Sequence, residues 1–513
     1  MEFHNLGGEH GVPDFKINPT VRQSAVLFTS EGKTTLQVSK TDTHQPDLLD
    51  YINNYKRLKP DAVIQFVEKS KIVELSERSG ISENEEKTAI QSQILDILSS
   101  AVQKRATDVH IRLGDNYCKV LFRIDRVLTP HIEINAEKGE RMITALYQTM
   151  CEGQNSSTFT ISRPVEANVS DEFVAQLKLN GGRLATRPTQ EKAVIVIRLL
   201  NKRDKALTLS QLGMTKEQQE IVERVIAIPT GVIILSGPTN SGKSTLAQSM
   251  CEMATDADPG THLITVEDPI ENIIRGAVQT PLQVVNRADP EAMGRAWADA
   301  ISNLMRLDPD QMLIGEVRDY ASATGAIAAA QTGHKVYTTL HTHFPIEIIS
   351  RLKTLQVDED LITDSSLIVC LMGQRLAPLL CPDCKIKYED AKGNVKNVDR
   401  KIIESHCDVN SVYMSNPSGC KSCNNTGFKG MTGIYEIIET DADFMQLYHE
   451  QGKTKAYEYW YKNGGQTITS NLIAGINKGQ IDPVYAHRKV CNLDRDSRVF
   501  TKDARSVVKG IKG

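Results

Sequence analysis

The chain has 513 residues, 40% of them hydrophobic, with a formal net charge of −4 and a pI near 6.3. This length accommodates roughly three domains, and the slightly acidic balance gives no large positive field, which argues against a nucleic-acid substrate. Because no apolar run reaches the ~18 residues of a membrane span and the first residues lack a signal-peptide pattern, we expect a cytoplasmic protein without direct membrane insertion.

The first 75 residues carry only a weak pattern. Residues 25–29 and 34–38 resemble two strands around a Ser-Glu-Gly-Lys turn, and helical patterns occur near residues 47–68. No catalytic motif occurs there, so we assign residues 1–75 to an N-terminal domain of unknown role. The polar, charged stretch 76–87 predicts a domain boundary or linker.

Residues 88–200 predict an α+β domain. Apolar residues recur at helical spacing from residue 90 to 102, and β-rich stretches follow at 108–113, 118–124 and 127–134. A second amphipathic helix is expected over 138–151. Strands are expected over 172–179 and 192–200, separated by a turn region at residues 181–182. The polar segment 201–205 closes the domain as a short tether.

A short apolar strand, residues 232–235, leads into a glycine-bounded loop that ends in lysine and serine. Gly237, Gly242, Lys243 and Ser244 satisfy the phosphate-loop pattern G-x-x-x-x-G-K-[ST]. The glycines let backbone N–H groups surround phosphates, the lysine reaches the β/γ oxygens, and the serine hydroxyl ligates Mg²⁺. The residues expected to bind the nucleotide are Gly237, Pro238, Thr239, Asn240, Ser241, Gly242, Lys243, Ser244 and Thr245.

Further short apolar strands, interleaved with helical stretches, follow the loop and predict a parallel sheet with helices on both faces. Three of them end in polar residues, Glu267, Glu316 and His341. Ligands of such sheets bind at the carboxyl ends of the strands. A single glutamate after a strand is usually a solvated loop residue, but three polar residues that each close a different strand favour a functional site.

Two C-x-x-C pairs follow, at Cys381 and Cys384 and at Cys420 and Cys423. Four thiolates in two such pairs suit a tetrahedral zinc ion, which we expect to be structural because no position is left open for water. The competing interpretation is a redox pair or ordinary buried cysteines.

The remaining cysteines show no paired spacing and are expected to be free: Cys118, Cys151, Cys251, Cys370, Cys407 and Cys491. Beyond residue 440 the chain alternates helical patterns with glycine breaks. Residues 441–513 therefore predict a helical C-terminal subdomain.

Four segments together resemble a known family. Residues 237–245, 264–271, 313–319 and 332–342 are similar to the Walker A, Asp box, Walker B and His box of the type II secretion and type IV pilus ATPases. The resemblance runs from about residue 88 to at least 440. It implies an α/β fold with a RecA-like ATPase domain at 206–440, including a zinc element at 381–423, preceded by a PAS-like α+β domain at 88–200. Asn240 departs from the glycine common in the family, and the usual Pro-Gln-Asp-Gly is missing before Arg183.

The resemblance implies ATP hydrolysis, with ATP, Mg²⁺ and Zn²⁺ as cofactors. Glu316 is the first choice for the carboxylate that orients or deprotonates the attacking water, and Glu267 is a second candidate. His341 would sense the γ-phosphate or link the site to a neighbouring domain, unless it is only a hydrogen-bonded structural histidine. Arg198 and Arg183, from the preceding domain, would close over the nucleotide.

The same resemblance implies a homo-hexamer that docks on an inner-membrane platform protein, and thereby associates peripherally with the inner membrane. Its function would be to power assembly of a type IV pilus or a type II secretion filament. The alternatives are a RecA-like nucleic-acid translocase, a conjugation or type IV secretion ATPase, and an adaptor that binds ATP without hydrolysing it. We expect no nucleic-acid partner, because the net charge is acidic and no basic patch with aromatic residues occurs.

Overall fold

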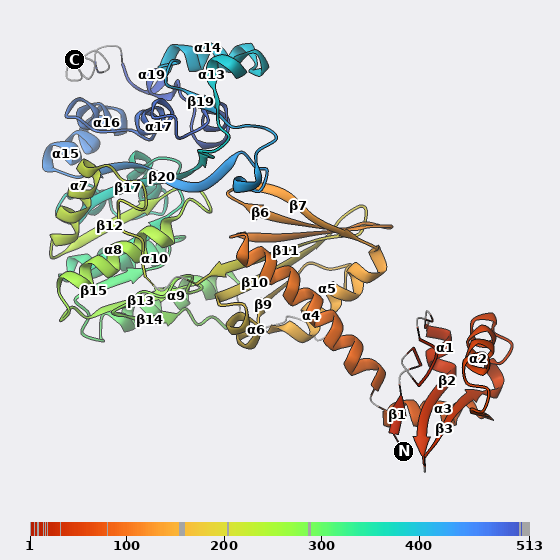
Figure 1. Ribbon diagram of the computed structural model, residues 1–513. Helices are drawn as coiled ribbons and strands as arrows, with labels where there is room; N and C mark the ends of the chain where they lie inside the picture. Colours follow the sequence, from red (N-terminus) through yellow and green to blue (C-terminus); the bar gives the residue numbers. More distant parts are fainter. Residues whose placement is uncertain are drawn as a thin grey trace.

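The computed structural model contains three large elements, each built around a sheet, and a helical region at the C-terminal end (Figure 1). The described residues are 2–4, 6–7, 10–13, 15, 17, 19–30, 32–79, 81–152, 160–202, 205–285, 289–501 and 504. Among them, no helix is both long and apolar enough to cross a membrane.

The first sheet has the order β1-β2-β3-β4. Both strands predicted in this part are confirmed, since β2 is Ala25–Ser30 and β3 is Lys33–Ser39. The helical prediction for 47–68 is confirmed only by α2, Pro46–Leu58, and is wrong for β4, Val63–Val67, which pairs in parallel with β3. The run Val-Ile-Gln-Phe-Val has high strand propensity, and this pairing overrides the apparent helical spacing. The other elements are β1 (Glu2–His4), α1 (Pro19–Ser24), a 3₁₀ turn (Lys40–Asp42) and α3 (Lys69–Ser79).

The polar stretch 76–87 is largely helical. Helix α3 ends at Ser79 and α4, Ile81–Gln103, begins two residues later, while residue 80 lies outside the described residues. In Figure 1, α4 leads away from the first sheet and runs to the second. The predicted boundary therefore coincides with a junction between two helices.

The second sheet has the order β7-β6-β5-β11-β10-β9-β8. Three strands have the predicted bounds, β5 (Asp108–Leu113), β6 (Cys118–Ile124) and β7 (Val127–Ile134). Helix α5, Ala136–Met150, confirms the second amphipathic helix, and β11, Ala193–Asn201, confirms the last strand. The remaining elements are β8 (Cys151–Glu152), β9 (Val165–Val169), α6 (Asp171–Gln176) and β10 (Leu179–Pro188).

Two predictions in this sheet are wrong. The expected strand 172–179 is mostly helix α6, whose first turn carries Asp171 and Glu172, and acidic side chains favour a helix N-terminus. The expected turn at residues 181–182 lies inside β10. A Cβ at Gly182 would lie 2.7 Å from Val169 Cγ2, so glycine there permits close approach of β9. The tether 201–205 includes residues 203–204, which lie outside the described residues.

The third sheet has the order β14-β13-β15-β16-β12-β17-β20. All neighbours pair in parallel except β17 and β20, which are antiparallel. The strands are β12 (Gly231–Ser236), β13 (Leu263–Glu267), β14 (Ala277–Pro281), β15 (Gln311–Ile314), β16 (Lys335–Leu340), β17 (Ile368–Leu380) and β20 (Phe428–Glu439).

Helices cover both faces of this sheet, as predicted. Val232 and Ile234 of β12 share a core with α9 (Pro290–Leu304) and α10 (Tyr320–Gln331). Ile233 and Leu235 share the opposite core with α7 (Lys216–Ala227) and α8 (Lys243–Ala257). Strand β12 is buried along its whole length, which is why it reads as an uninterrupted apolar run. Shorter helices are α11 (Ile348–Thr354), preceded by a 3₁₀ turn at Pro345–Glu347, and α12 (Glu359–Ile362).

The described part of the predicted C-terminal subdomain 441–513 is helical, as predicted, while residues 502–503 and 505–513 lie outside the described residues. It contains α15 (Ala442–Gln451), α16 (Lys453–Lys462), α17 (Ile468–Asn477), α18 (Pro483–Tyr485), a π-helical turn (Ala486–Val490) and α19 (Arg495–Val499). The excursion between β17 and β20 contains β18 (Ile386–Lys387), α13 (Tyr388–Ala391), α14 (Asn397–His406), β19 (Tyr413–Met414) and 3₁₀ turns at Lys392–Asn394 and Lys421–Cys423. It shares a core with α17 and the chain after it.

Candidate functional site

The phosphate loop lies between β12 and α8, and three of its residues have positive φ: 152° at Gly237, 62° at Asn240 and 91° at Gly242. A Cβ at Gly237 would lie 2.4 Å from the carbonyl oxygen of Gln374, so only glycine fits there. Asparagine tolerates the left-handed conformation better than most residues. The departure at Asn240 is therefore compatible with the loop.

The side chains of Lys243 and Ser244 are held by groups around the loop. Lys243 is buried, and its Nζ donates to the carbonyl oxygens of Gly237 at 2.9 Å and Pro238 at 3.5 Å. Burial lowers the pKa of Lys243, while the nearby carboxylates of Glu316 and Glu271 act in the opposite direction. Ser244 Oγ donates to Glu271 Oε2 at 2.5 Å. The loop's hydroxyl thus already contacts a carboxylate, the ligand type that Mg²⁺ prefers.

Glu271 was missed by the sequence analysis. It lies four residues after Glu267, inside the segment 264–271 that resembles the Asp box, and that position was the available signal. Its contact with Ser244 joins residues 27 positions apart, and no local pattern predicts such a pairing.

Glu316 and His341 are brought together by the strand order. They follow the adjacent parallel strands β15 and β16, and Glu316 Oε1 lies 2.9 Å from His341 Nε2. The second oxygen, Oε2, accepts from Arg318 Nη2 at 2.8 Å. The Glu316 side chain is 19% exposed and that of His341 is 45% exposed, so the pair is accessible beside Lys243.

Glu267 has a different environment from Glu316. It ends β13, is buried, and its Oε1 accepts hydrogen bonds from Thr265 Oγ1 and Gln279 Nε2, both at 2.8 Å. Burial raises the pKa of Glu267, although the two hydrogen bonds act in the opposite direction. A carboxylate held in this way is suited to organising the site.

The two predicted arginines lie opposite each other on neighbouring strands, Arg183 on β10 and Arg198 on β11. Arg183 is exposed, and Arg198 Nε forms an ion pair with Asp108 Oδ1 at 3.3 Å. A third arginine of this sheet contacts the phosphate loop, since Arg126 Nη2 donates to the carbonyl oxygen of Asn240 at 3.3 Å. Composition alone could not separate Arg126 from its basic neighbours.

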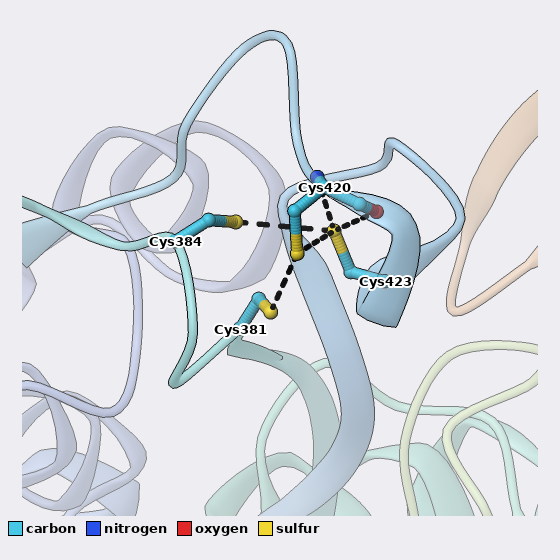
Figure 2. Close-up of side chains that lie close together, drawn as sticks. All are labelled: Cys381, Cys384, Cys420 and Cys423. Atoms are coloured by element: carbon cyan, nitrogen blue, oxygen red, sulfur yellow. Dashed lines mark hydrogen bonds between the residues drawn. The ribbon is translucent and has the colours of Figure 1, made fainter.

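The four predicted cysteine ligands form one cluster. Figure 2 shows their side chains converging from two loops, and the four sulfur atoms lie within 4.8 Å of one another. The Sγ–Sγ distances are 3.8 Å for Cys381 and Cys420, 3.9 Å for Cys384 and Cys423, and 3.8 Å for Cys420 and Cys423. A tetrahedron with Zn–S bonds of about 2.3 Å has edges of about 3.8 Å, so the donor set fits zinc.

Backbone N–H groups stabilise the thiolate of one ligand, Cys423. Cys423 Sγ accepts from the N–H groups of Cys420 at 3.2 Å and Gly427 at 3.3 Å. Burial raises the pKa of Cys423, but these N–H groups and the neighbouring thiols outweigh it and lower that pKa to about 6. Each pair faces the other pair, which favours a shared metal over a redox pair. All ten cysteines are free of disulfides.

The segment after His341 connects the site to the C-terminal helices. The ring of Phe344 contacts two guanidinium groups, with its centre 5.0 Å from Arg375 Cζ and 3.6 Å from Arg495 Cζ. Arg495 donates to the Tyr457 hydroxyl at 3.1 Å, and that hydroxyl donates to the buried Glu436 at 2.6 Å. The chain just after the His box therefore contacts a buried polar network of the C-terminal region.

A sequence profile for the family described as "Type II/IV secretion system protein" matches residues 83–491. The chain belongs to this family. Type II secretion system ATPase E of Vibrio cholerae serotype O1 is 32% identical over 410 residues, which cover 79% of this chain and 76% of that protein. Type IV pilus assembly ATPase PilB of Myxococcus xanthus is 31% identical over 351 residues, which cover 67% and 57%. These matches confirm the resemblance predicted from the sequence.

A solved motor structure shares the fold. The crystal structure of the pilus retraction motor PilT with bound ADP superposes with a TM-score of 0.51, at 22% identity, over 78% of this chain and 99% of that one. Membership confirms the predictions of a RecA-like α/β fold and of a motor ATPase that uses ATP and Mg²⁺. Members of the family work with secretion or pilus systems.

Proposed function

We propose that this ATPase powers assembly of a type IV pilus or a type II secretion filament, as a ring of six chains on an inner-membrane platform protein at the cytoplasmic face. The observation that carries the proposal is the continuous family match over residues 83–491, which contains all four boxes. The relatives named for type II secretion and for pilus assembly support it. The cysteine cluster is compatible with the zinc element that the resemblance to this family implies.

In this proposal the residues of the site divide the work of phosphoryl transfer. Lys243 leaves the carbonyl oxygens of Gly237 and Pro238 for the β- and γ-phosphates, whose negative charge attracts it more strongly than a neutral carbonyl does. Mg²⁺ held by Ser244, with Glu271 beside it, would neutralise charge on the same phosphates. Both side chains are positioned for this role by contacts that the nucleotide replaces.

Glu316 orients and deprotonates the attacking water in this scheme. Arg318 donates to Oε2, and the ring of His341 lies 2.9 Å from Oε1, so the carboxylate is fixed in direction, and movement of that ring would clear Oε1 for the water. His341 is the partner that can leave, since its ring is nearly half exposed and lies on the strand end next to Glu316. Glu267 keeps the site organised from its buried position.

The proposed domain organisation is the one expected from the sequence: 1–75, 88–200, 206–440 and 441–513. Arg183 and Arg198 of the second domain close over the nucleotide when the ring forms. Their placement on adjacent strands would let both arginines contact the nucleotide together. Arg198 would then replace its ion pair with Asp108 by an ion pair with a phosphate.

Filament assembly in cells tests the proposal. A host lacking this gene is complemented with the wild-type chain, with Lys243→Ala, or with the matched surface variant Lys353→Ala, whose side chain is 59% exposed. Filaments or filament-dependent secretion should return with the wild type and the surface variant and stay absent with Lys243→Ala at equal protein level. Native mass measurement with ATP should give six chains, and Arg183→Ala or Arg198→Ala should reduce turnover of that ring. Normal filaments with Lys243→Ala, or ATPase activity that requires DNA, would refute the proposal.

A further inference from the structure

The turn between β6 and β7 has an unusual composition. Ile124 pairs with Val127, so Asp125 and Arg126 are its two central residues, and their φ angles are 45° and 68°. A two-residue hairpin turn with positive φ at both positions is of type I′, which favours Asn-Gly, Asp-Gly or Gly-Gly, so Asp125 is an ordinary first residue and Arg126 an unusual second one. A long side chain is disfavoured in this conformation. Strain of this kind persists where surrounding contacts hold it, and it concentrates at functional positions.

This turn contacts the phosphate loop and two strands of the ATPase sheet, all of which lie far away in the sequence. Arg126 Nη1 donates to the carbonyl oxygen of Leu376 in β17 at 2.9 Å, and Nη2 donates to that of Asn240 in the phosphate loop at 3.3 Å. Asp125 Oδ2 accepts from the N–H of Gly430 in β20 at 3.0 Å. One guanidinium therefore bridges the phosphate loop and the strand beside it.

The strand that Arg126 ties to the loop also supports the loop from behind. A Cβ at Gly242 would meet Gln374 Nε2 at 2.9 Å and the Leu376 side chain at 3.6 Å, so β17 is packed directly against the loop. Asn240, at the exposed outer side of the loop, has its carbonyl held by Arg126. The loop is thus fixed between β17 and the turn, with Asn240 in its left-handed conformation.

Other arginines near this turn have other partners. Arg123 forms an ion pair with Asp108 at 3.8 Å and donates to the backbone carbonyl of Arg126 at 3.4 Å, which supports the turn itself. Arg105 lies 3.8 Å from Asp125. The described hydrogen bonds from this sheet to the phosphate loop come from Arg126.

We propose that Arg126 is a positioning residue for nucleotide binding, which holds the phosphate loop in its binding shape and makes nucleotide affinity depend on the docked position of the β6–β7 turn. Fixing the loop before ligand arrives lowers the ordering cost of binding. The coupling is reciprocal, so bound nucleotide stabilises the docked turn to the same extent. This role is independent of which filament the motor serves.

The test uses Arg126→Gly in the full chain, because glycine accepts the φ of 68° without strain and keeps the turn intact. We expect its Tm to equal or exceed that of the wild type. Its Kd for Mg-ADP should rise about tenfold, as expected for loss of charge-assisted hydrogen bonds at a partly buried position, while kcat at saturating ATP stays within about twofold. Hydrogen exchange should become faster in residues 237–243, and nucleotide should no longer protect residues 124–127.

Two further variants separate positioning from charge. Arg126→Lys keeps the charge but can reach only one carbonyl, so it should recover only part of the affinity. Arg187→Ala, an exposed arginine on β10 of the same sheet, should leave Kd unchanged. Full recovery by lysine would make Arg126 a long-range charge and overturn the proposal. An unchanged Kd in a folded Arg126→Gly protein, or a lower kcat at unchanged Kd, would overturn it too.

Discussion

Replacing Glu316 by glutamine tests the assignment of the catalytic base, because it removes basicity and keeps the size of the side chain. In the structure, one carboxylate oxygen meets His341 at 2.9 Å and the other meets Arg318 at 2.8 Å. Glutamine can keep its carbonyl oxygen on Arg318 and turn its amide toward the His341 ring, which accepts in one tautomer. The ground-state geometry is therefore preserved, and the variant should bind ATP with nearly normal affinity.

The loss should appear in the chemical step. General base catalysis contributes about 10²- to 10⁴-fold, so turnover of Glu316→Gln should fall by at least ~100-fold, equivalent to about 2.7 kcal/mol or more in the barrier. Lys243, Ser244 and the loop are unchanged in this variant, so nucleotide binding provides an internal control for folding.

The assay is steady-state phosphate release at saturating ATP, together with binding of a fluorescent ATP analogue. Glu267→Gln is the matched variant. Because Glu267 is buried and already accepts two hydrogen bonds on one oxygen, glutamine should cost it less than about tenfold in turnover. Near-normal turnover by Glu316→Gln, together with a large loss in Glu267→Gln, would show that the base is Glu267.

Two other predictions concern metal and pH. Metal analysis should find one zinc ion per chain. The double variant Cys381→Ser with Cys420→Ser should release this zinc and speed hydrogen exchange between residues 381 and 423, because a segment that ligates zinc folds with its metal. Full retention of zinc by the double variant would contradict this site. Burial of Lys335, whose Nζ donates to the carbonyl of Ile226, lowers its pKa from 10.5 to about 8. Between pH 8 and 10.5 the unfolded state therefore binds more protons than the folded state. Below pH 8 the buried, protonated Lys335 lowers the free energy of unfolding by about 3 kcal/mol, and this loss disappears as pH rises from 8 to 10.5. The stability advantage of Lys335→Met over the wild type should therefore be largest below pH 8. If the difference in unfolding free energy between the two proteins does not change from pH 8 to 10.5, this reasoning is refuted.

Local patterns predicted the elements whose identity depends on neighbouring residues. The alternation in residues 108–134 defines three strands, and the apolar run before Gly237 defines β12. The phosphate loop and the cysteine cluster were predictable because their chemistry needs fixed residue types at fixed spacing. The placement of Glu316 and His341 in one site was predictable because the carboxyl ends of parallel strands lie at the same edge of a sheet.

Long-range pairing was beyond such patterns. Strands β17 and β20 pair antiparallel although an excursion of 47 residues separates them, between Leu380 and Phe428, and β4 is fixed as a strand by its pairing with β3. The contacts of Ser244 with Glu271 and of Arg126 with Asn240 likewise join distant segments. Each depends on tertiary geometry, which residue spacing does not encode.

The contacts of Phe344 link the nucleotide site to a tryptophan, Trp460, whose fluorescence can report on that site. His341 and Phe344 are three residues apart, and the segment between them is stiffened by hydrogen bonds from the N–H groups of His343 and Phe344 to Glu347, at 3.1 and 3.3 Å. Arg495 carries the contact on to Tyr457, whose ring stacks on Trp460 at 5.4 Å between centres. The other tryptophan of the chain, Trp297, is buried in the core beside the ATPase sheet. In a Trp297→Phe background, emission from Trp460 should thus follow the state of the nucleotide site without any added label.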